Sequence, residues 1–147
     1  MTLTRRTLLT ALPALAALGP LPALAANPTI YRDAGCGCCH KWSLAMADAG
    51  LPVVLVDADD MAAVHAKLGV PETLRGCHAG EIAGYVIEGH VPPKDILRLL
   101  QERPAARGLA VTGMPQGSVG METGTIDPYE VLLFQGNGSS TVFAKYG

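Results

Sequence analysis

Apolar positions in the first half of the chain follow two different periods. Short apolar runs at residues 29–31 and 53–56 are typical of strands, and the unbroken second run predicts a buried one. Apolar residues recur at helical spacing over residues 42–49 and 61–68, and a glycine follows each of these segments and ends the helix. The pattern predicts the order strand, helix, strand, helix.

The middle of the chain continues this order. Residues 73–77 and 85–88 are predicted to form two strands around a glycine-containing turn. Residues 93–100 carry apolar side chains at helical spacing behind a proline, and Pro104 breaks this third helix. A strand–helix–strand unit followed by a hairpin and a covering helix indicates an α/β domain with a mixed sheet flanked by helices.

The C-terminal region has a different pattern. Residues 108–124 are rich in glycine, and the segments 129–134 and 141–146 then predict two strands. Asn137-Gly138 between them is a strong signal for a tight hairpin turn. We therefore expect a C-terminal β-hairpin extension on the α/β domain.

Residues 1–25 resemble an export signal. Arg5-Arg6 precedes an apolar stretch that ends in the small-x-small sequence Ala23-Leu24-Ala25, and the paired arginines indicate the twin-arginine type. Three prolines in this stretch argue against its alternative role as a retained membrane anchor. We expect cleavage after Ala25, export to the periplasm, and a single domain over residues 26–147.

Charge and aromatic content exclude some partners. Without Arg5 and Arg6, nine basic residues face 13 acidic ones, which gives a net charge of −4. A mildly acidic domain with seven aromatic residues is a poor nucleic-acid binder. Because no segment is both basic and amphipathic, we also expect no membrane binding once the signal is removed.

The four cysteines supply the main chemical signal. Cys36, Cys38 and Cys39 lie within four residues, and Cys77 follows later. Two structural disulfides are possible in an oxidising compartment, but crowding three cysteines into one loop is unusual for a disulfide scaffold. The clustering favours a metal site or a redox relay.

Cys36 and Cys39 form a C-x-x-C pair between the first strand and the first helix. The free amides and positive dipole of a helix N-terminus stabilise thiolates. This placement resembles the thioredoxin superfamily and implies a thioredoxin-like three-layer domain, with Pro71 as a candidate cis-proline. Cys38 stands where that superfamily commonly has proline, and a third soft donor favours metal capture over disulfide exchange.

Several further side chains are candidate metal ligands. The same topology brings Cys77-His78 toward the cysteine loop, although Cys77 also fits the alternative of a buried structural cysteine. His40 follows the cluster directly and could add an imidazole, whereas His65 lies on the apolar side of its helix and is interpreted as a packing residue.

Two methionines lie in the glycine-rich segment. Met114 and Met121 are seven positions apart, and thioether sulfur binds Cu(I). The alternative is that both side chains cover the edge of the core.

Several ordered motifs together resemble the CopG-like family of predicted metal-binding proteins, over about residues 30–134. The resemblance implies a thioredoxin-like fold, a periplasmic location and a place in copper resistance. It implies Cu(I) binding by Cys36, Cys38 and Cys39, and it adds Cys77, His78 and His90 as motif residues. The motifs are Cys36-Gly37-Cys38-Cys39-x-Lys41-Trp42, Gly69-Val70-Pro71-x-x-Leu74, Cys77-His78, Gly84-Tyr85-Val86-Ile87-Glu88-Gly89-His90-Val91-Pro92, Gly113-Met114-Pro115-Gln116-Gly117-Ser118 and Gly120-Met121-Glu122.

Three functions remain open on the sequence. The first is a protein that binds Cu(I) and exchanges it with other periplasmic copper proteins; zinc is the competing metal, since four cysteines can form a tetrahedral site. The second is an enzyme, a thiol oxidoreductase with Cys36 as nucleophile and Cys39 as resolving thiol. The third is a small exported domain whose cysteines are purely structural.

Overall fold

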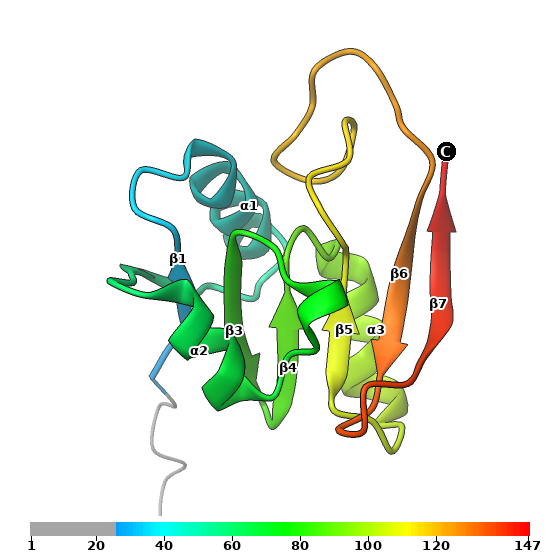
Figure 1. Cartoon of the computed structure of the whole chain (residues 1–147). Helices are drawn as coiled ribbons and strands as arrows, with labels where there is room; N and C mark the ends of the chain where they lie inside the picture. Colours follow the sequence, from blue (N-terminus) through cyan, green and yellow to red (C-terminus); the bar gives the residue numbers. More distant parts are fainter. Residues whose placement is uncertain (1–25) are drawn as a thin grey trace, which may run out of the picture.

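Seven strands form one mixed sheet in the order β2-β1-β3-β4-β5-β6-β7 (Figure 1). The computed structural model describes residues 26–147, so the predicted signal at residues 1–25 lies outside the described part. The elements are β1 (Thr29–Arg32), α1 (Gly37–Asp48), β2 (Val54–Asp57), α2 (Met61–Leu68), the 3-10 turn η1 (Glu72–Leu74), β3 (His78–Ile82), β4 (Tyr85–Glu88), α3 (Pro93–Glu102), β5 (Gly108–Ala110), β6 (Tyr129–Phe134) and β7 (Ser140–Tyr146).

The pairing of the strands confirms the predicted fold class. β1 pairs parallel with β2 and antiparallel with β3, and β3 pairs antiparallel with β4. β5 adds parallel to β4, and the β6–β7 hairpin extends the sheet with antiparallel pairs. The chain is therefore an α/β domain with a mixed sheet, flanked by helices and extended by a C-terminal hairpin.

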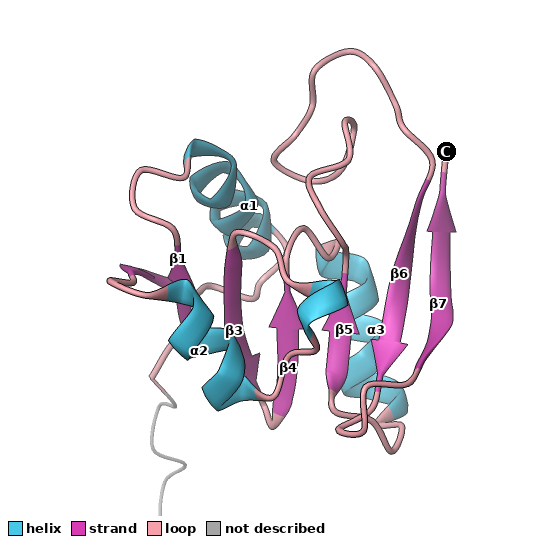
Figure 2. Cartoon of the chain, in the orientation of Figure 1, coloured by secondary structure: helices cyan, strands magenta, loops and turns pink. Residues whose placement is uncertain are grey.

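Helices cover both faces of the sheet. On one face, Trp42 of α1 and Ile96 of α3 belong to the same buried cluster as Ile87 of β4. On the other face, Leu74 of η1 packs in a second cluster with Val86 of β4, and α2 lies on this side (Figure 2). Neighbouring residues of β4 point to opposite layers because side chains alternate along a strand.

The helix ends follow from their sequences. The side chain of Asp60 accepts a hydrogen bond from the amide of Ala63 at 3.1 Å and caps the start of α2. Gly69 ends that helix with φ +72°, a conformation that glycine adopts without strain. Pro93 occupies the first turn of α3, where a missing N–H costs nothing.

Two strand predictions need correction. The apolar segment at residues 53–56 does form a strand, β2, but β2 is an edge strand, with Val54 47% and Val56 38% exposed. The predicted strand at residues 73–77 is wrong, since Glu72–Leu74 forms a 3-10 turn and β3 begins at His78. β5 lies inside the glycine-rich segment and was not predicted, because three residues are too few to show a period.

The prediction of a cis-proline at Pro71 is also wrong, because residues 26–147 contain no cis peptide bond. Pro71 caps η1 with an extended backbone. Between Pro71 and β3 the chain makes this additional turn, so Cys77 rather than a proline directly precedes β3 and reaches the cysteine loop.

The predicted hairpin is confirmed and is tied to the rest of the domain at its open end. The rings of Tyr129 and Tyr146 stack with centroids 4.8 Å apart, and the Tyr146 hydroxyl donates to the buried carboxylate of Asp95 on α3.

None of the helices in residues 26–147 is long and apolar enough to cross a membrane.

The strand directions bring four connecting segments to one edge of the sheet, the edge at which β1, β4 and β5 end and β3 begins. The pairing makes β1, β4 and β5 run in one direction and β3 in the other. The loops that follow β1, β4 and β5 therefore meet the segment that precedes β3. The loop after β1 leads through Cys36 into α1, whose first turn carries Cys38 and Cys39. The loops after β4 and β5 hold His90 and the two methionines, and the segment before β3 holds Cys77.

Candidate metal centre

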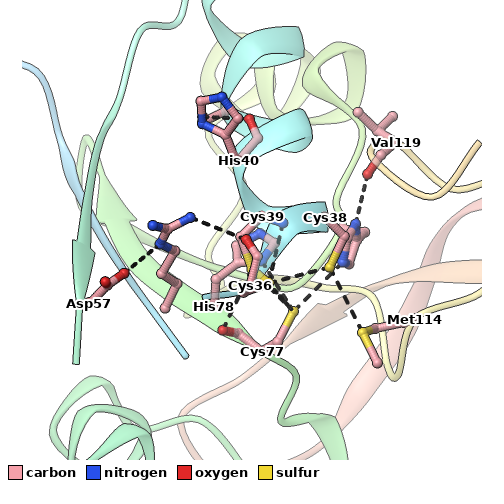
Figure 3. Close-up of a disulfide and its surroundings, with 12 residues drawn as sticks. Cys36, Cys38, Cys39, His40, Asp57, Cys77, His78, Met114 and Val119 are labelled. Carbon is pink, nitrogen blue, oxygen red and sulfur yellow. Dashed lines mark hydrogen bonds and ion pairs between the residues drawn. A yellow bond between two sulfur atoms is a disulfide. The ribbon is translucent and has the colours of Figure 1, made fainter. Parts of the chain in front are cut away.

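Four cysteine sulfurs gather at this edge. The Sγ atoms of Cys36, Cys38, Cys39 and Cys77 all lie within 4.8 Å of one another (Figure 3). Cys36 and Cys39 form a disulfide, and Cys38 and Cys77 are free thiols. Cys77 Sγ lies 3.4 Å from Cys39 Sγ and 3.6 Å from Cys36 Sγ, and Cys38 Sγ lies 3.3 Å from Cys36 Sγ.

The first cysteine loop is held by the start of α1 and by an arginine. Cys36 caps α1, with its sulfur 3.3 Å from the amide of Cys39. The Arg32 guanidinium donates to the Cys36 carbonyl at 3.1 Å and pairs with Asp57 at 2.7 Å. The start of α1 and the Arg32 guanidinium thus fix the position of the Cys36–Cys39 pair.

Two hydrogen bonds of the local backbone fix the position of Cys77. The amide of Asp33 donates to the Cys77 carbonyl at 2.9 Å, and the amide of Gly76 donates to Glu88 Oε1 at 2.6 Å. Burial raises the pKa of the Cys77 thiol to about 12, and the neighbouring Cys38 sulfur adds to this shift. Without a cation nearby, Cys77 is therefore a protonated thiol at neutral pH.

Two imidazoles adjoin Cys77 on the inner side. His78 Nδ1 and His90 Nε2 each lie 3.7 Å from Cys77 Sγ, and these three donors form a second group within 4.8 Å. Burial lowers the pKa of His78 to about 3 and also lowers the pKa of His90. Both side chains are therefore neutral at pH 7, which is the form that binds metals.

The orientation of each ring is set by its neighbours. His90 Nδ1 lies 2.7 Å from the carbonyl oxygen of Val119, so Nδ1 carries the proton and Nε2 presents a lone pair toward Cys77. His78 packs against Trp42 with ring centroids 4.6 Å apart, and its Nε2 is buried without a hydrogen-bond partner. A neutral ring with an oriented lone pair is the usual arrangement of a metal-binding histidine.

The remaining candidate ligands differ in how close they lie to the cysteine sulfurs. Met114 is 53% exposed, and its Sδ lies 3.9 Å from Cys38 Sγ. Met121 lines a surface pocket together with Cys38 and Lys41, and no contact of its sulfur with the site is seen within residues 26–147. His40 is exposed on α1 and points away from the sulfurs in Figure 3.

Sequence reasoning missed three groups that support the site. Arg32 was not singled out, and the Val119 carbonyl could not be found because a backbone acceptor leaves no signal in the side-chain pattern. Glu88 lies in a quoted motif, and its position in an otherwise apolar strand was the available signal. His65 is buried as predicted, but it faces Glu88 with Nε2 3.3 Å from Oε2 rather than packing only on apolar groups.

The fold and these contacts define a class of protein: an α/β domain with a cluster of cysteines and histidines, able to hold a metal ion, at one edge of the sheet. A family model described as "Protein of unknown function, DUF411" matches residues 74–121. No curated protein matches the chain.

Two solved structures are similar over most of the chain. They are titled "Copper resistance protein copG- Form 1" and "Copper resistance protein copG- Form 2", and each is 44% identical with a TM-score of 0.77. The matches cover 81% and 82% of this chain and 95% and 97% of the two solved chains, respectively. The chain therefore belongs to the CopG family of copper-resistance proteins, as its motifs predicted.

Proposed function

We propose that this protein binds Cu(I) through thiolates and handles copper in the periplasm as part of copper resistance. The observation that carries the proposal is the gathering of four cysteine sulfurs within 4.8 Å. Cys36, Cys38, Cys39 and Cys77 supply the thiolates, and soft sulfur donors select Cu(I). The titles of the two similar structures, which name copper resistance, support the same metal.

The surrounding donors favour copper over zinc. Cys77 belongs both to the group of four sulfurs and to the group that it forms with His78 and His90. The Met114 thioether lies next to the Cys38 sulfur. A structural zinc ion is bound by four cysteine or histidine ligands in a tetrahedron, and this ligand set does not include a thioether. Met121, which lines the pocket beside Cys38, stays a weaker candidate for the same role.

The disulfide couples metal binding to redox state. In the disulfide form, two of the four sulfurs are bonded to each other and cannot act as thiolates. A dithiol reductant that donates two electrons and two protons cleaves the bond, is itself oxidised to a disulfide, and restores both thiols. Reduction therefore makes all four sulfurs available to the metal. The reverse exchange with a disulfide oxidant, which is itself reduced to a dithiol, re-forms the Cys36–Cys39 bond and releases the metal.

The proposed periplasmic location rests on the sequence of residues 1–25. Residues 1–25 act as a twin-arginine type export signal, and residues 26–147 form the single mature domain in the periplasm. The partners are the metal ion and other periplasmic copper proteins that deliver or receive it. Because the mature domain has a net negative charge, it is a poor nucleic-acid binder.

The test is an anaerobic titration of residues 26–147 with Cu(I) against a competing chelator. The reduced protein is expected to bind tightly, and the serine variants of Cys36, Cys38, Cys39 and Cys77 are expected to bind more weakly. A Ser43→Ala variant, altered at an exposed hydroxyl of α1 that bonds within its own helix, is the matched control. Binding no tighter than that of a cysteine-free variant would refute the proposal, and a parallel zinc titration tests the competing metal.

A second function rests on the disulfide itself. A C-x-x-C disulfide that starts a helix suits a thiol–disulfide oxidoreductase, with Cys36 as nucleophile and Cys39 as resolving thiol. Cys38→Ser separates the two functions. An oxidoreductase keeps most of its activity on a disulfide substrate in this variant, whereas a copper site loses affinity.

A further inference from the structure

A buried carboxylate lies directly behind the segment that carries Cys77. Glu88 is 0% exposed and stands at the end of β4, an interior strand of the sheet. Its side chain is on the same face as Val86, toward the layer that contains α2. A carboxylate in such a place costs free energy unless polar partners compensate for the lost water.

The two oxygens of Glu88 face two different elements. Oε1 accepts the hydrogen bond from the Gly76 amide at 2.6 Å, which is short and strong for an amide donor. Oε2 lies 3.3 Å from Nε2 of His65 on α2, within ion-pair distance, and neither atom has a hydrogen-bond partner in the described part of the chain. The side chain thus connects α2, β4 and the segment before β3.

The connection ends one residue from the sulfur of Cys77. The Gly76 backbone lies so close to the carboxylate that an added Cβ would be 3.2 Å from Glu88 Oε1. On its other side Cys77 is held by the amide of Asp33, and the next residue accepts a bond from the Gly89 amide at 2.9 Å. Glu88 therefore supplies a side-chain tether in a segment that is otherwise held mainly by backbone hydrogen bonds.

We propose that Glu88, supported by His65, is a positioning residue that holds the Gly76–Cys77 segment so that the Cys77 sulfur reaches both the cysteine loop and His90. Its role in metal binding rests on the proposed function, but its control of Cys77 does not. The arrangement is a support of the kind that orients metal ligands without touching the metal.

The test separates the tether from general stability. Glu88→Leu removes both oxygens at similar size, and Glu88→Gln keeps an acceptor for the Gly76 amide. In the reduced, metal-free protein, alkylation of Cys77 is followed by peptide mass spectrometry, with Cys38 as the internal reference. We expect several-fold faster alkylation of Cys77 in Glu88→Leu, an unchanged rate for Cys38, and rescue by Glu88→Gln. Glu81→Leu, at a solvent-exposed position of β3, is the control for loss of a carboxylate.

Copper binding gives the second readout. Loss of a residue that orients ligands typically lowers metal affinity about tenfold or more, and this is the loss expected for Glu88→Leu, with recovery in Glu88→Gln. If the wild type binds no Cu(I), the proposed function fails while the alkylation result still decides the role of Glu88. An unchanged Cys77 alkylation rate in folded Glu88→Leu would overturn the inference.

If circular dichroism shows that Glu88→Leu is unfolded, a second variant replaces it. His65→Leu then carries the test, because it leaves the Gly76 bond in place and removes the support on Oε2. Faster alkylation of Cys77 relative to Cys38 in this variant supports the inference, and equal rates in His65→Leu and the wild type overturn it.

Discussion

The sulfur atoms of Cys39 and Cys77 lie 3.4 Å apart although 38 positions separate the two residues in the chain. Cys39 is in the first turn of α1, and Cys77 directly precedes β3. β1 and β3 are antiparallel neighbours, so the loop that leaves β1 meets the segment that enters β3. This contact joins the C-x-x-C pair to the imidazoles, which approach only Cys77 among the four cysteines within hydrogen-bonding range.

The disulfide predicts how many thiols can be counted. Oxidised protein that is denatured without reductant should show two reactive thiols, from Cys38 and Cys77, and reduction should raise the number to four. A thiol assay in denaturant measures both values. In Cys38→Ser the oxidised count should fall to one, and in Cys36→Ser it should be three. A single thiol in oxidised Cys36→Ser would indicate a disulfide that does not involve Cys36.

Met114 and Met121 should differ in their effect on copper. Met114 Sδ lies 3.9 Å from Cys38 Sγ, whereas Met121 lines the neighbouring pocket. Replacement of Met114 by leucine removes a soft donor at nearly constant volume and should lower Cu(I) affinity several-fold. Met121→Leu serves as the matched variant and should change the affinity less. Equal effects of the two substitutions in a chelator competition would contradict this assignment.

Gly120 fixes the methionine-bearing loop against α1. A Cβ at this position would lie 2.6 Å from the Cys38 carbonyl oxygen and 3.0 Å from the Trp42 amide. Gly120→Ala should therefore lower the free energy of unfolding by about 1–3 kcal/mol through overpacking, beyond the cost of a positive φ. Urea denaturation measures the difference.

Gly124 provides the control for this experiment. It has φ +88°, close to the +90° of Gly120, but a Cβ there meets open space. Gly124→Ala should lose only the roughly 1–2 kcal/mol of backbone strain. If both variants lose the same stability, the close approach of the loop to α1 is not limiting.

Burial of His78 should make the metal-free, reduced protein sensitive to acid. Its pKa falls from 6.5 to about 3 because desolvation disfavours the charged ring. Below about pH 6.5 the unfolded chain binds a proton that the folded chain does not, so stability is greatest above this pH and falls progressively toward pH 3. Thermal unfolding at several pH values should therefore show a flatter pH dependence in His78→Asn than in the wild type.

His40 is the comparison for that measurement. It is an exposed histidine on α1, so His40→Asn should keep the acid sensitivity of the wild type. Identical pH profiles for His78→Asn and the wild type would show that another buried group causes the loss of stability.

Local periodicity was enough to predict most elements of this fold. The structure confirmed the helix predicted from the spacing of Trp42 and Met46, the end of a helix at Gly69 and the hairpin predicted from Asn137-Gly138. These features depend on neighbours a few positions apart, and such contacts can be seen in a linear sequence. The motifs around the three clustered cysteines also led to the correct family.

Burial and long-range contacts needed the tertiary structure. The apolar run of β2 gave no sign of an edge strand, because exposure depends on which strands pair on either side. The thioredoxin-like resemblance predicted the approach of Cys77 to the cysteine loop, but nothing near Cys77 in the sequence indicated the 3-10 turn or the tether from Glu88. The sequence alone determined the donor types and the family, whereas the strand order decided which donors meet, because only the sheet brings residues so distant in the chain to one edge.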